Sequence, residues 1–201
     1  PHPLERPLMS VQSSFHLPDE QTGSRPRIAK LFSLARAVDN WPRTLADHVG
    51  LARADYVCRL RNGLRFHVRG GTDDRHVIYE VFAEAIYPVA LRAGSIVLDI
   101  GAHIGCFTLL AARQGAHVFS FEPFPSNFAA LQRNLALNAA TRAVAFQIAV
   151  TGTKETRKMF VPDRGDYTGR FSLHPGRGAQ TLEVPCKSLD QVIAENALDR
   201  I

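Results

Sequence analysis

Residues 97–123, VLDIGAHIGCFTLLAARQGAHVFSFEP, constrain the fold more than any other part of the chain. An apolar run ends in Asp99, a turn with two glycines and a helix-like stretch follow, and a second apolar run ends in Glu122. A short apolar strand without alternation is typical of a parallel sheet whose two faces are both covered. The stretch therefore predicts a strand, a helix and a second strand of such a sheet.

The alternation continues further along the chain. Residues 125–138 have the pattern of a second helix and residues 143–150 that of a third strand. Strands and helices that alternate at this spacing favour an α/β fold with a Rossmann-like parallel sheet. After the third strand we predict strand segments over 154–163 and 179–189, and a helix over 188–198 that Ser188 or Asp190 caps.

We expect the chain to have three parts: a flexible tail (1–26), an N-terminal helical and hairpin extension (27–92) and the Rossmann-like domain (93–201). Within the extension we predict a helix near its start, a hairpin over 55–71 with a type I′ turn at Asn62-Gly63, and a helix over 72–89 that Pro88 ends. The apolar face of the first helix would comprise Ile28, Leu31, Phe32, Ala35 and Val38, and that of the last helix Val77, Val81, Phe82 and Ala85.

Composition narrows the choice of partners. The formal net charge is +5, but no short window concentrates it, so we expect no nucleic-acid partner. No apolar run approaches the roughly 20 residues of a membrane helix, so we expect no membrane partner. The three cysteines are far apart in sequence, which predicts neither a disulfide framework nor a metal site and suits a reducing cytoplasm.

The glycine turn between strand and helix predicts a bound cofactor, because glycine permits close approach and the helix N-terminus offers free N–H groups. A dinucleotide fingerprint has glycine at the position of His103, where a side chain would obstruct a pyrophosphate. Asp99 adds negative charge at the same place. A nicotinamide cofactor is therefore disfavoured, and a turn without any ligand is the plain alternative.

S-adenosylmethionine fits the pattern better, because it carries an ammonium group and no phosphate. Asp99 would face its ammonium group, the helix after Gly105 its carboxylate, and Glu122 its ribose hydroxyls. We expect Val150, at the end of the third strand, to line the adenine site. The predicted cofactor-binding residues are Asp99, Gly101, Ala102, His103, Gly105, Glu122, Pro123 and Val150.

These segments carry a family resemblance. VLDIGAHIGCFTLLAA, FSFEPFPSNFAALQRNLALN and VPCKSLDQVI, with TDDRHVIYEVFAEAIY upstream, resemble the FkbM family of methyltransferases over roughly residues 60–201. The resemblance implies a class I methyltransferase fold, S-adenosylmethionine as cofactor, and transfer of a methyl group to an oxygen of a sugar or natural product. A non-catalytic cofactor-binding domain with a scaffold role is the alternative.

The family pattern continues into a fourth strand that ends in an acidic D-x-E-G motif, whereas this sequence stops at Ile201. We therefore expect a piece of a longer methyltransferase, with its sheet truncated after the third strand and the following helix. The catalytic base is not identified by the motifs. Candidates are Glu80, His103, Asp166 and Tyr167. Further residues that we expect near a substrate are Asp73, Tyr87, Arg170 and His174.

Overall fold

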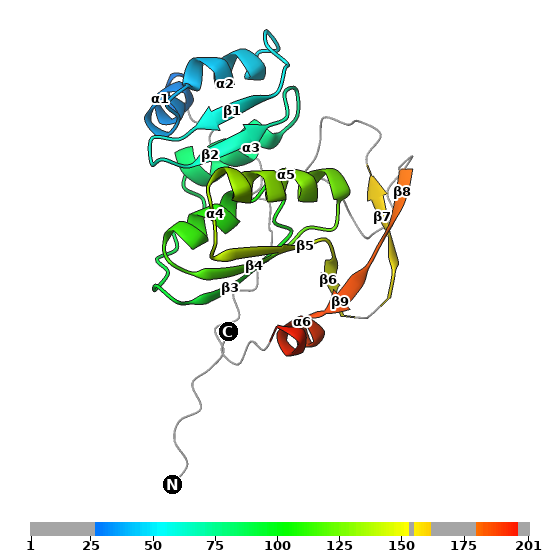
Figure 1. Cartoon of the computed structure of the whole chain (residues 1–201). Helices are drawn as coiled ribbons and strands as arrows, with labels where there is room; N and C mark the ends of the chain where they lie inside the picture. The colour runs from blue at the N-terminus through cyan, green and yellow to red at the C-terminus, as the bar shows by residue number, and fades with distance from the viewer. Residues whose placement is uncertain (1–26, 153–154, 162–179, 197–201) are drawn as a thin grey trace.

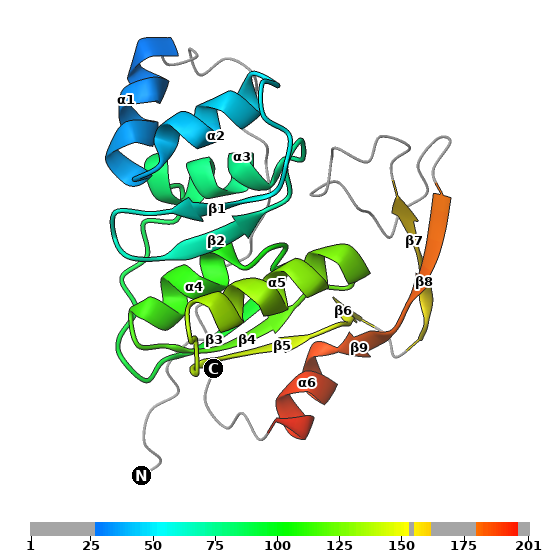
Figure 2. The same cartoon turned by 45° about the horizontal axis from the view of Figure 1, so that its top comes forward.

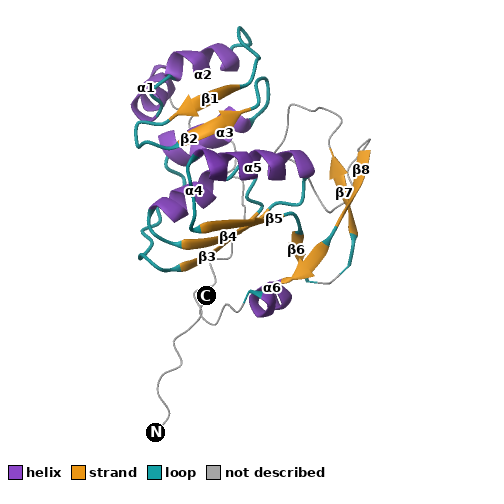
Figure 3. Cartoon of the chain, in the orientation of Figure 1, coloured by secondary structure: helices purple, strands orange, loops and turns teal. Residues whose placement is uncertain are grey.

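The computed structural model describes residues 27–152, 155–161 and 180–196. The predicted tail (1–26) and the loop candidates Asp166, Tyr167, Arg170 and His174 lie outside the described residues. Figure 1 shows the described elements along the chain, and Figure 3 separates helices from strands.

The centre of the fold is a parallel sheet with strand order β3-β4-β5. Its strands are β3 (Ile96–Ile100), β4 (His117–Phe121) and β5 (Ala143–Phe146). Helices α4 (Cys106–Arg113) and α5 (Pro125–Leu137) connect them and lie on the same side of the sheet (Figures 1 and 2). The alternation of parallel strands and helices confirms the predicted α/β, Rossmann-like fold.

The prediction that β3 is buried on both faces is wrong for the described chain. Ile100 in β3 is 56% exposed and Val144 in β5 is 49% exposed. The reason is that α4 and α5 cover one side of the sheet, and within the described ranges β3 pairs with β4 alone.

The predicted third strand over 143–150 is two strands. After β5 the chain leaves the sheet at Gln147, and β6 (Ala149–Thr151) pairs in parallel with β9 (Cys186–Ser188). The backbone N–H of Ala149 donates to the carbonyl of Pro185 at 2.9 Å, which marks the change of partner. The split follows from this exchange of hydrogen-bond partners and not from a local sequence signal.

The predicted strand segments near the end of the described chain are present. Strands β7 (Arg157–Val161) and β8 (Gln180–Val184) form an antiparallel pair. Helix α6 (Leu189–Glu195) begins after Ser188, whose side chain and that of Gln191 form a capping box. Ser188, and not Asp190, is therefore the cap.

The extension begins with helices α1 (Arg27–Ala37) and α2 (Trp41–His48), of which only α1 was predicted. The predicted apolar face of the first helix is confirmed at Val38 but wrong at Ile28, Leu31 and Phe32, which are exposed. Leu34 and Val38 are buried, whereas Ile28 is 70% exposed and Phe32 is 67% exposed. Val38 forms a bridge with Leu60 of the hairpin, and this contact turns the opposite side of α1 away from the core.

The hairpin consists of β1 (Tyr56–Arg59) and β2 (Arg65–Val68), as predicted, but its turn is not type I′. Gly63 has a φ of +92°, whereas Asn62 does not enter the positive-φ region that type I′ requires. The Leu60 N–H donates to the Leu64 carbonyl at 2.8 Å, so three residues form the loop. A single left-handed glycine is sufficient for a loop of that length.

The predicted helix over 72–89 ends earlier than Pro88. Helix α3 (Asp74–Ile78) continues into one π-helical turn, η1 (Tyr79–Ala83), and the chain then takes a positive φ of +52° at Ala85. Ala85 is exposed, so it does not belong to the apolar face. The early end leaves Tyr87 outside the helix.

One apolar core joins the extension to the sheet unit. It includes Phe66 and Val68 from β2, Ile104 from the turn after β3, and Leu109 from α4. The edge of β2 is hydrogen-bonded to side chains of α5 and its C-cap: Asn134 and Asn138 accept from the N–H groups of His67 and Arg65 at 2.7 and 2.9 Å. Every helix in the described part of the chain is too short or too polar to span a bilayer.

Candidate functional site

The turn after β3 has an unusual backbone. Gly101, His103 and Gly105 have φ values of +84°, +51° and +88°, a region that residues other than glycine rarely adopt. A Cβ on Gly105 would lie 2.5 Å from Cδ1 of Leu131, whereas a Cβ on Gly101 would meet nothing within 4 Å. Glycine is therefore required at position 105 by packing as well as by the positive φ, and at position 101 by the positive φ alone.

The end of β4 holds this turn in place. The N–H groups of Gly101 and Ala102 donate to the carbonyl of Phe121 at 2.9 and 3.1 Å. Gly105 then precedes α4, whose first N–H groups lack partners within the helix. The turn thus brings the positive end of α4 close to the carboxyl end of the sheet.

Asp99 lies at the end of β3 and is 8% exposed. Its carboxylate accepts a hydrogen bond from Thr108 Oγ1 at 2.5 Å, and Thr108 Oγ1 lies 2.9 Å from Ser120 Oγ. Burial raises the pKa of Asp99 to about 6, although the Thr108 hydrogen bonds lower it. Among the described residues no basic side chain pairs with Asp99, so at neutral pH it is a buried anion suited to a cationic ligand group.

Glu122 lies directly after β4 and is 5% exposed. Its Oε2 accepts from the His103 N–H at 2.8 Å, and its Oε1 accepts from the Phe124 N–H at 3.0 Å. Burial raises the pKa of Glu122, and these backbone hydrogen bonds oppose the rise. An ionised carboxylate offers about four acceptor positions, so it can still receive hydrogen bonds from a ligand.

His103 takes part in the site through both its backbone and its ring. Its N–H donates to Glu122, and its ring Nε2 lies 3.9 Å from Oδ1 of the fully buried Asp74. Burial acts to raise the pKa of Asp74, but hydrogen bonds and charge from Arg69 outweigh it and lower that pKa. Asp73, Asp74 and His103 each place one potential metal-ligand atom within 4.8 Å of the others, although Arg69 already supplies a positive charge there.

Three other predicted residues, Glu80, Tyr87 and Val150, lie on segments outside the turn. Glu80 belongs to η1 and pairs with His76 at 3.0 Å. The Tyr87 ring packs on Phe107 at 5.0 Å, and burial and the charge of Asp99 raise the pKa of Tyr87, which places it beside the turn. Val150 is half-buried in β6, beyond the point where the chain leaves the sheet.

The predicted residue Pro123 and the buried Cys106 flank the turn. Pro123 is half-buried between Glu122 and α5. Cys106 opens α4, and burial raises the pKa of its thiol well above the ordinary value, so the thiol stays protonated and unreactive at neutral pH.

Sequence reasoning missed the polar residues that support the two acids. Thr108 and Ser120 interrupt the apolar runs of α4 and β4, and Asn127 interrupts the apolar face of α5. All three are buried. A polar residue inside an apolar run was the available signal, because buried polar groups need hydrogen-bond partners.

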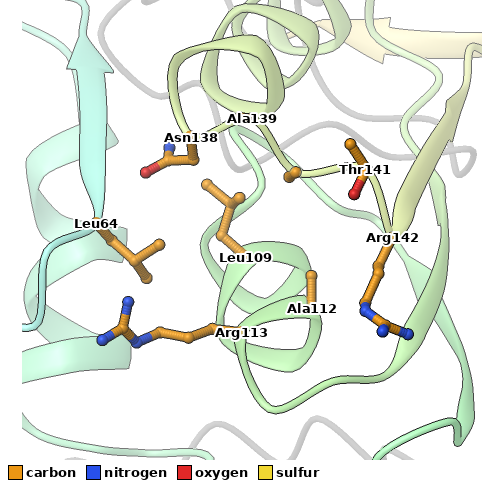
Figure 4. A pocket seen from close by; sticks show the side chains of 9 residues that line it. Leu64, Leu109, Ala112, Arg113, Asn138, Ala139, Thr141 and Arg142 are labelled. Carbon is orange, nitrogen blue, oxygen red and sulfur yellow. The ribbon is translucent and has the colours of Figure 1, made fainter.

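A pocket of about 240 Å³ lies elsewhere, at the far ends of α4 and α5 (Figure 4). It is lined by the end of α4, the chain that follows α5 and Leu64 of the hairpin, with Arg113 and Arg142 at its border. Neither Asp99 nor Glu122 lines it. The pocket and the paired acids are therefore separate features.

The two acids lie at the carboxyl ends of adjacent parallel strands, at the edge of the sheet where open α/β folds bind ligands. A buried anion beside one helix N-terminus, and a second carboxylate with free acceptor positions, suit a ligand that has a cationic group and a diol. The arrangement lacks the glycine that a pyrophosphate would need at position 103.

Comparisons with known proteins show the family of the chain. The sequence profile of the methyltransferase FkbM domain matches residues 99–201, more than half of the chain. The chain is 36% identical over 129 residues to the 31-O-demethyl-FK506 methyltransferase FkbM of Streptomyces tacrolimicus, covering 61% of this chain and 48% of that protein. It is 32% identical over 97 residues to the methyltransferase sdnD of Sordaria araneosa, covering 46% of this chain and 38% of that protein.

The chain thus spans less than half the length of these two relatives. Among solved structures, TYW2 of P. horikoshii in complex with MeSAdo is 20% identical, with a TM-score of 0.37, over 54% of this chain and 47% of that one. The match of the FkbM domain profile begins at Asp99 and includes the glycine turn and Glu122. The chain belongs to the FkbM methyltransferase family.

Proposed function

We propose that the protein binds S-adenosylmethionine and transfers its methyl group to an oxygen of a small molecule. The observation that carries this proposal is the pair of buried carboxylates, Asp99 and Glu122, at the ends of the adjacent strands β3 and β4. A buried anion without a basic partner among the described residues is costly. A cationic ligand group would offset that cost.

Each part of the cofactor has a group that suits it. Asp99 would receive the ammonium group, and the N-terminus of α4 would face the carboxylate. Glu122 would accept hydrogen bonds from the ribose hydroxyls. Pro123 and Val150 are proposed to contribute apolar contacts to the adenine.

The bound cofactor would supply an activated methyl group on a sulfonium, so the protein has to bind, orient and exclude water. Removal of the hydroxyl proton from the acceptor requires a nearby base. His103 and Glu80 stay candidates for that role among the described residues, and Asp166 and Tyr167 stay candidates outside them. The Glu80 carboxylate would have to leave its pairing with His76 to accept a proton.

The acceptor is proposed to be a hydroxyl of a sugar or another natural product. One relative is named as the methyltransferase of 31-O-demethyl-FK506, and this supports transfer to an oxygen of a natural product. The three cysteines are buried free thiols, which fits the reducing cytoplasm that we propose as the location.

Isothermal titration calorimetry with S-adenosylmethionine and S-adenosylhomocysteine tests the proposal. We expect both ligands to bind, and Glu122→Ala to weaken binding by roughly tenfold or more, the effect of losing hydrogen bonds to a charged group. Glu183→Ala, at an exposed position of β8, is the control and should bind like the unchanged protein. Absence of binding, or equal binding by Glu122→Ala, would refute the proposal. Binding without transfer to any hydroxyl acceptor would favour the scaffold role.

A further inference from the structure

Arg69 follows β2 and belongs to the extension, outside the strand–helix unit that carries the two acids. Its Nε donates to Oδ2 of Asp74 at 2.8 Å, and its Nη2 donates to Oδ1 at 2.6 Å. The backbone N–H of Arg69 also donates to Oδ2, at 3.0 Å. The Asp74 side chain is fully buried and that of Arg69 is 18% exposed, so the pair is largely removed from solvent.

One branch of contacts leads from this pair to Glu122 through the turn after β3. Oδ1 of Asp74 lies 3.9 Å from the ring Nε2 of His103. The His103 N–H then donates to Glu122 Oε2 at 2.8 Å. Because His103 has a φ of +51°, its backbone needs a surrounding that stabilises this conformation, and the contact with Asp74 contributes to it.

A second branch leads to the same carboxylate through the start of α5. Nη2 of Arg69 donates to Oδ1 of Asn127 at 2.8 Å, and Nη1 donates to Oγ of Ser126 at 3.1 Å. The Asn127 side chain in turn hydrogen-bonds Glu122. The guanidinium of Arg69 thus bonds both Asp74, whose carboxylate lies near the His103 ring, and the start of α5.

We infer that Arg69 and Asp74 are positioning residues, which hold the Glu122 carboxylate in the orientation that receives the ribose hydroxyls. This inference rests on the proposed function. The planar guanidinium makes several hydrogen bonds at fixed angles at once, and a lysine does not. A binding residue is most effective when contacts behind it fix its side chain, and both branches end at Glu122.

The same contacts argue against a cation bound by Asp73, Asp74 and His103. Arg69 bonds both carboxylate oxygens of Asp74, and a metal ion would have to displace it or share them. Addition of Mg²⁺, Mn²⁺ or Zn²⁺ to the ligand-free protein should therefore leave its melting temperature unchanged. A rise that Arg69→Met enhances and Asp74→Asn abolishes would overturn the inference in favour of a metal site.

The decisive experiment measures the affinity of S-adenosylhomocysteine and of its 2′-deoxy analogue by calorimetry, in the full chain. In the unchanged protein, loss of the hydroxyl should weaken binding by roughly tenfold or more, because a hydrogen bond to a carboxylate is lost. In Arg69→Met, we expect affinity for S-adenosylhomocysteine to fall roughly tenfold to hundredfold, as for other groups that orient a ligand-binding residue. The ratio of the dissociation constants of the 2′-deoxy analogue and S-adenosylhomocysteine should then shrink to about threefold or less, because Glu122 is no longer held in place.

Arg75→Met is the matched control. Arg75 also belongs to the extension, is 23% exposed in its side chain, and pairs with the buried Asp47 at 3.6 Å, but it is not part of either branch. We expect the control to keep the ratio of the unchanged protein. If Arg69→Met does not fold, the double variant Arg69→Met/Asp74→Asn carries the same test, because it leaves no buried charge unpaired.

The outcomes separate the inference from the proposed function. If the unchanged protein binds neither ligand, the proposed function fails. If it binds both and distinguishes them, but Arg69→Met or the double variant distinguishes them equally well, the inference fails and the proposed function stands. A ratio that also shrinks in Arg75→Met would assign the effect to general destabilisation, and would likewise overturn the inference.

Discussion

At the carboxyl end of the β3–β4–β5 sheet, Asp99 and Glu122 are 8% and 5% exposed and accept hydrogen bonds from hydroxyl and backbone groups. At the amino end, the pocket in Figure 4 has exposed arginines at its border, Arg113 and Arg142. The carboxyl end thus carries two buried carboxylates, whereas the pocket at the amino end is bordered by exposed arginines.

The difference shows that the buried charges lie at the carboxyl end and not around the pocket, although Ala139 in the pocket also has a positive φ, of +47°. A buried charge and a backbone held at a positive φ both need stabilising contacts from neighbouring groups. Such features therefore persist where several contacts support them, and at the carboxyl end two buried carboxylates and three residues with positive φ surround one turn. Surface arginines at the amino end need no such support. The two ends should consequently respond very differently to equivalent substitutions.

The largest difference in the free energy of unfolding is expected between Arg69→Met and Arg142→Met. Removal of Arg69 leaves Asp74 as a buried charge without its bidentate partner, and this should lower the free energy of unfolding by about 3–5 kcal/mol. Arg142 is exposed beside His117, so its replacement should change that free energy by about 0.5 kcal/mol or less. Urea denaturation of both variants measures the two values. Equal losses would contradict the contrast between the two ends.

A second contrast lies within the turn itself. In Gly105→Ala the new Cβ would meet Leu131 at 2.5 Å and would also have to adopt a positive φ. Overpacking and backbone strain together should lower the free energy of unfolding by about 2–5 kcal/mol. Gly101→Ala brings only the dihedral strain, about 1–2 kcal/mol, because nothing lies within 4 Å of its Cβ. Thermal unfolding of the two variants would disprove this account if Gly101→Ala were the more damaging change.

The smallest effect concerns the pH dependence of ligand affinity. Burial raises the pKa of Asp99 to about 6, and the ligand's ammonium group should prefer the ionised carboxylate. Affinity for S-adenosylhomocysteine should therefore fall roughly tenfold between pH 7 and pH 5, as Asp99 becomes protonated. Without ligand the sign is opposite: the folded protein holds this proton more tightly than the unfolded chain, so Asp99 contributes less stability as pH rises from about 4 to 6.

Asp99→Asn provides the control for the pH prediction, because its side chain does not titrate. Calorimetry across this pH range should show weak affinity in the variant with a much flatter pH dependence. A profile that stays steep in Asp99→Asn would mean that another group carries the effect.

The sequence was a good guide where the signal is local. Asp99, the turn glycines and Glu122 are specified by their places at the ends of two apolar runs, and the structure puts them beside one another. The cap of α6 was predicted only as one of two residues, Ser188 or Asp190, although both members of the capping box, Ser188 and Gln191, lie within four residues.

The sequence was a poor guide where contacts between distant segments decide the outcome. Arg69 and Asn127 are 58 positions apart, and no local pattern in either segment predicts their hydrogen bond. Helical spacing alone could not show which side of α1 faces the core, because the bridge between Val38 and Leu60 sets its orientation. The third strand divides because Ala149 exchanges one neighbouring strand for another, which is also a non-local event.

The most direct test of where the ligand binds is a titration of the isotope-labelled protein with S-adenosylhomocysteine, followed by backbone amide resonances in NMR spectra. The N–H groups of His103 and Phe124 both donate to Glu122, so their resonances should shift strongly. Those of Ala139 and Thr141, which line the pocket at the amino end, should stay in place. Shifts confined to Ala139 and Thr141, or no shifts at all, would contradict the assignment of the cofactor site to the carboxyl end of the sheet.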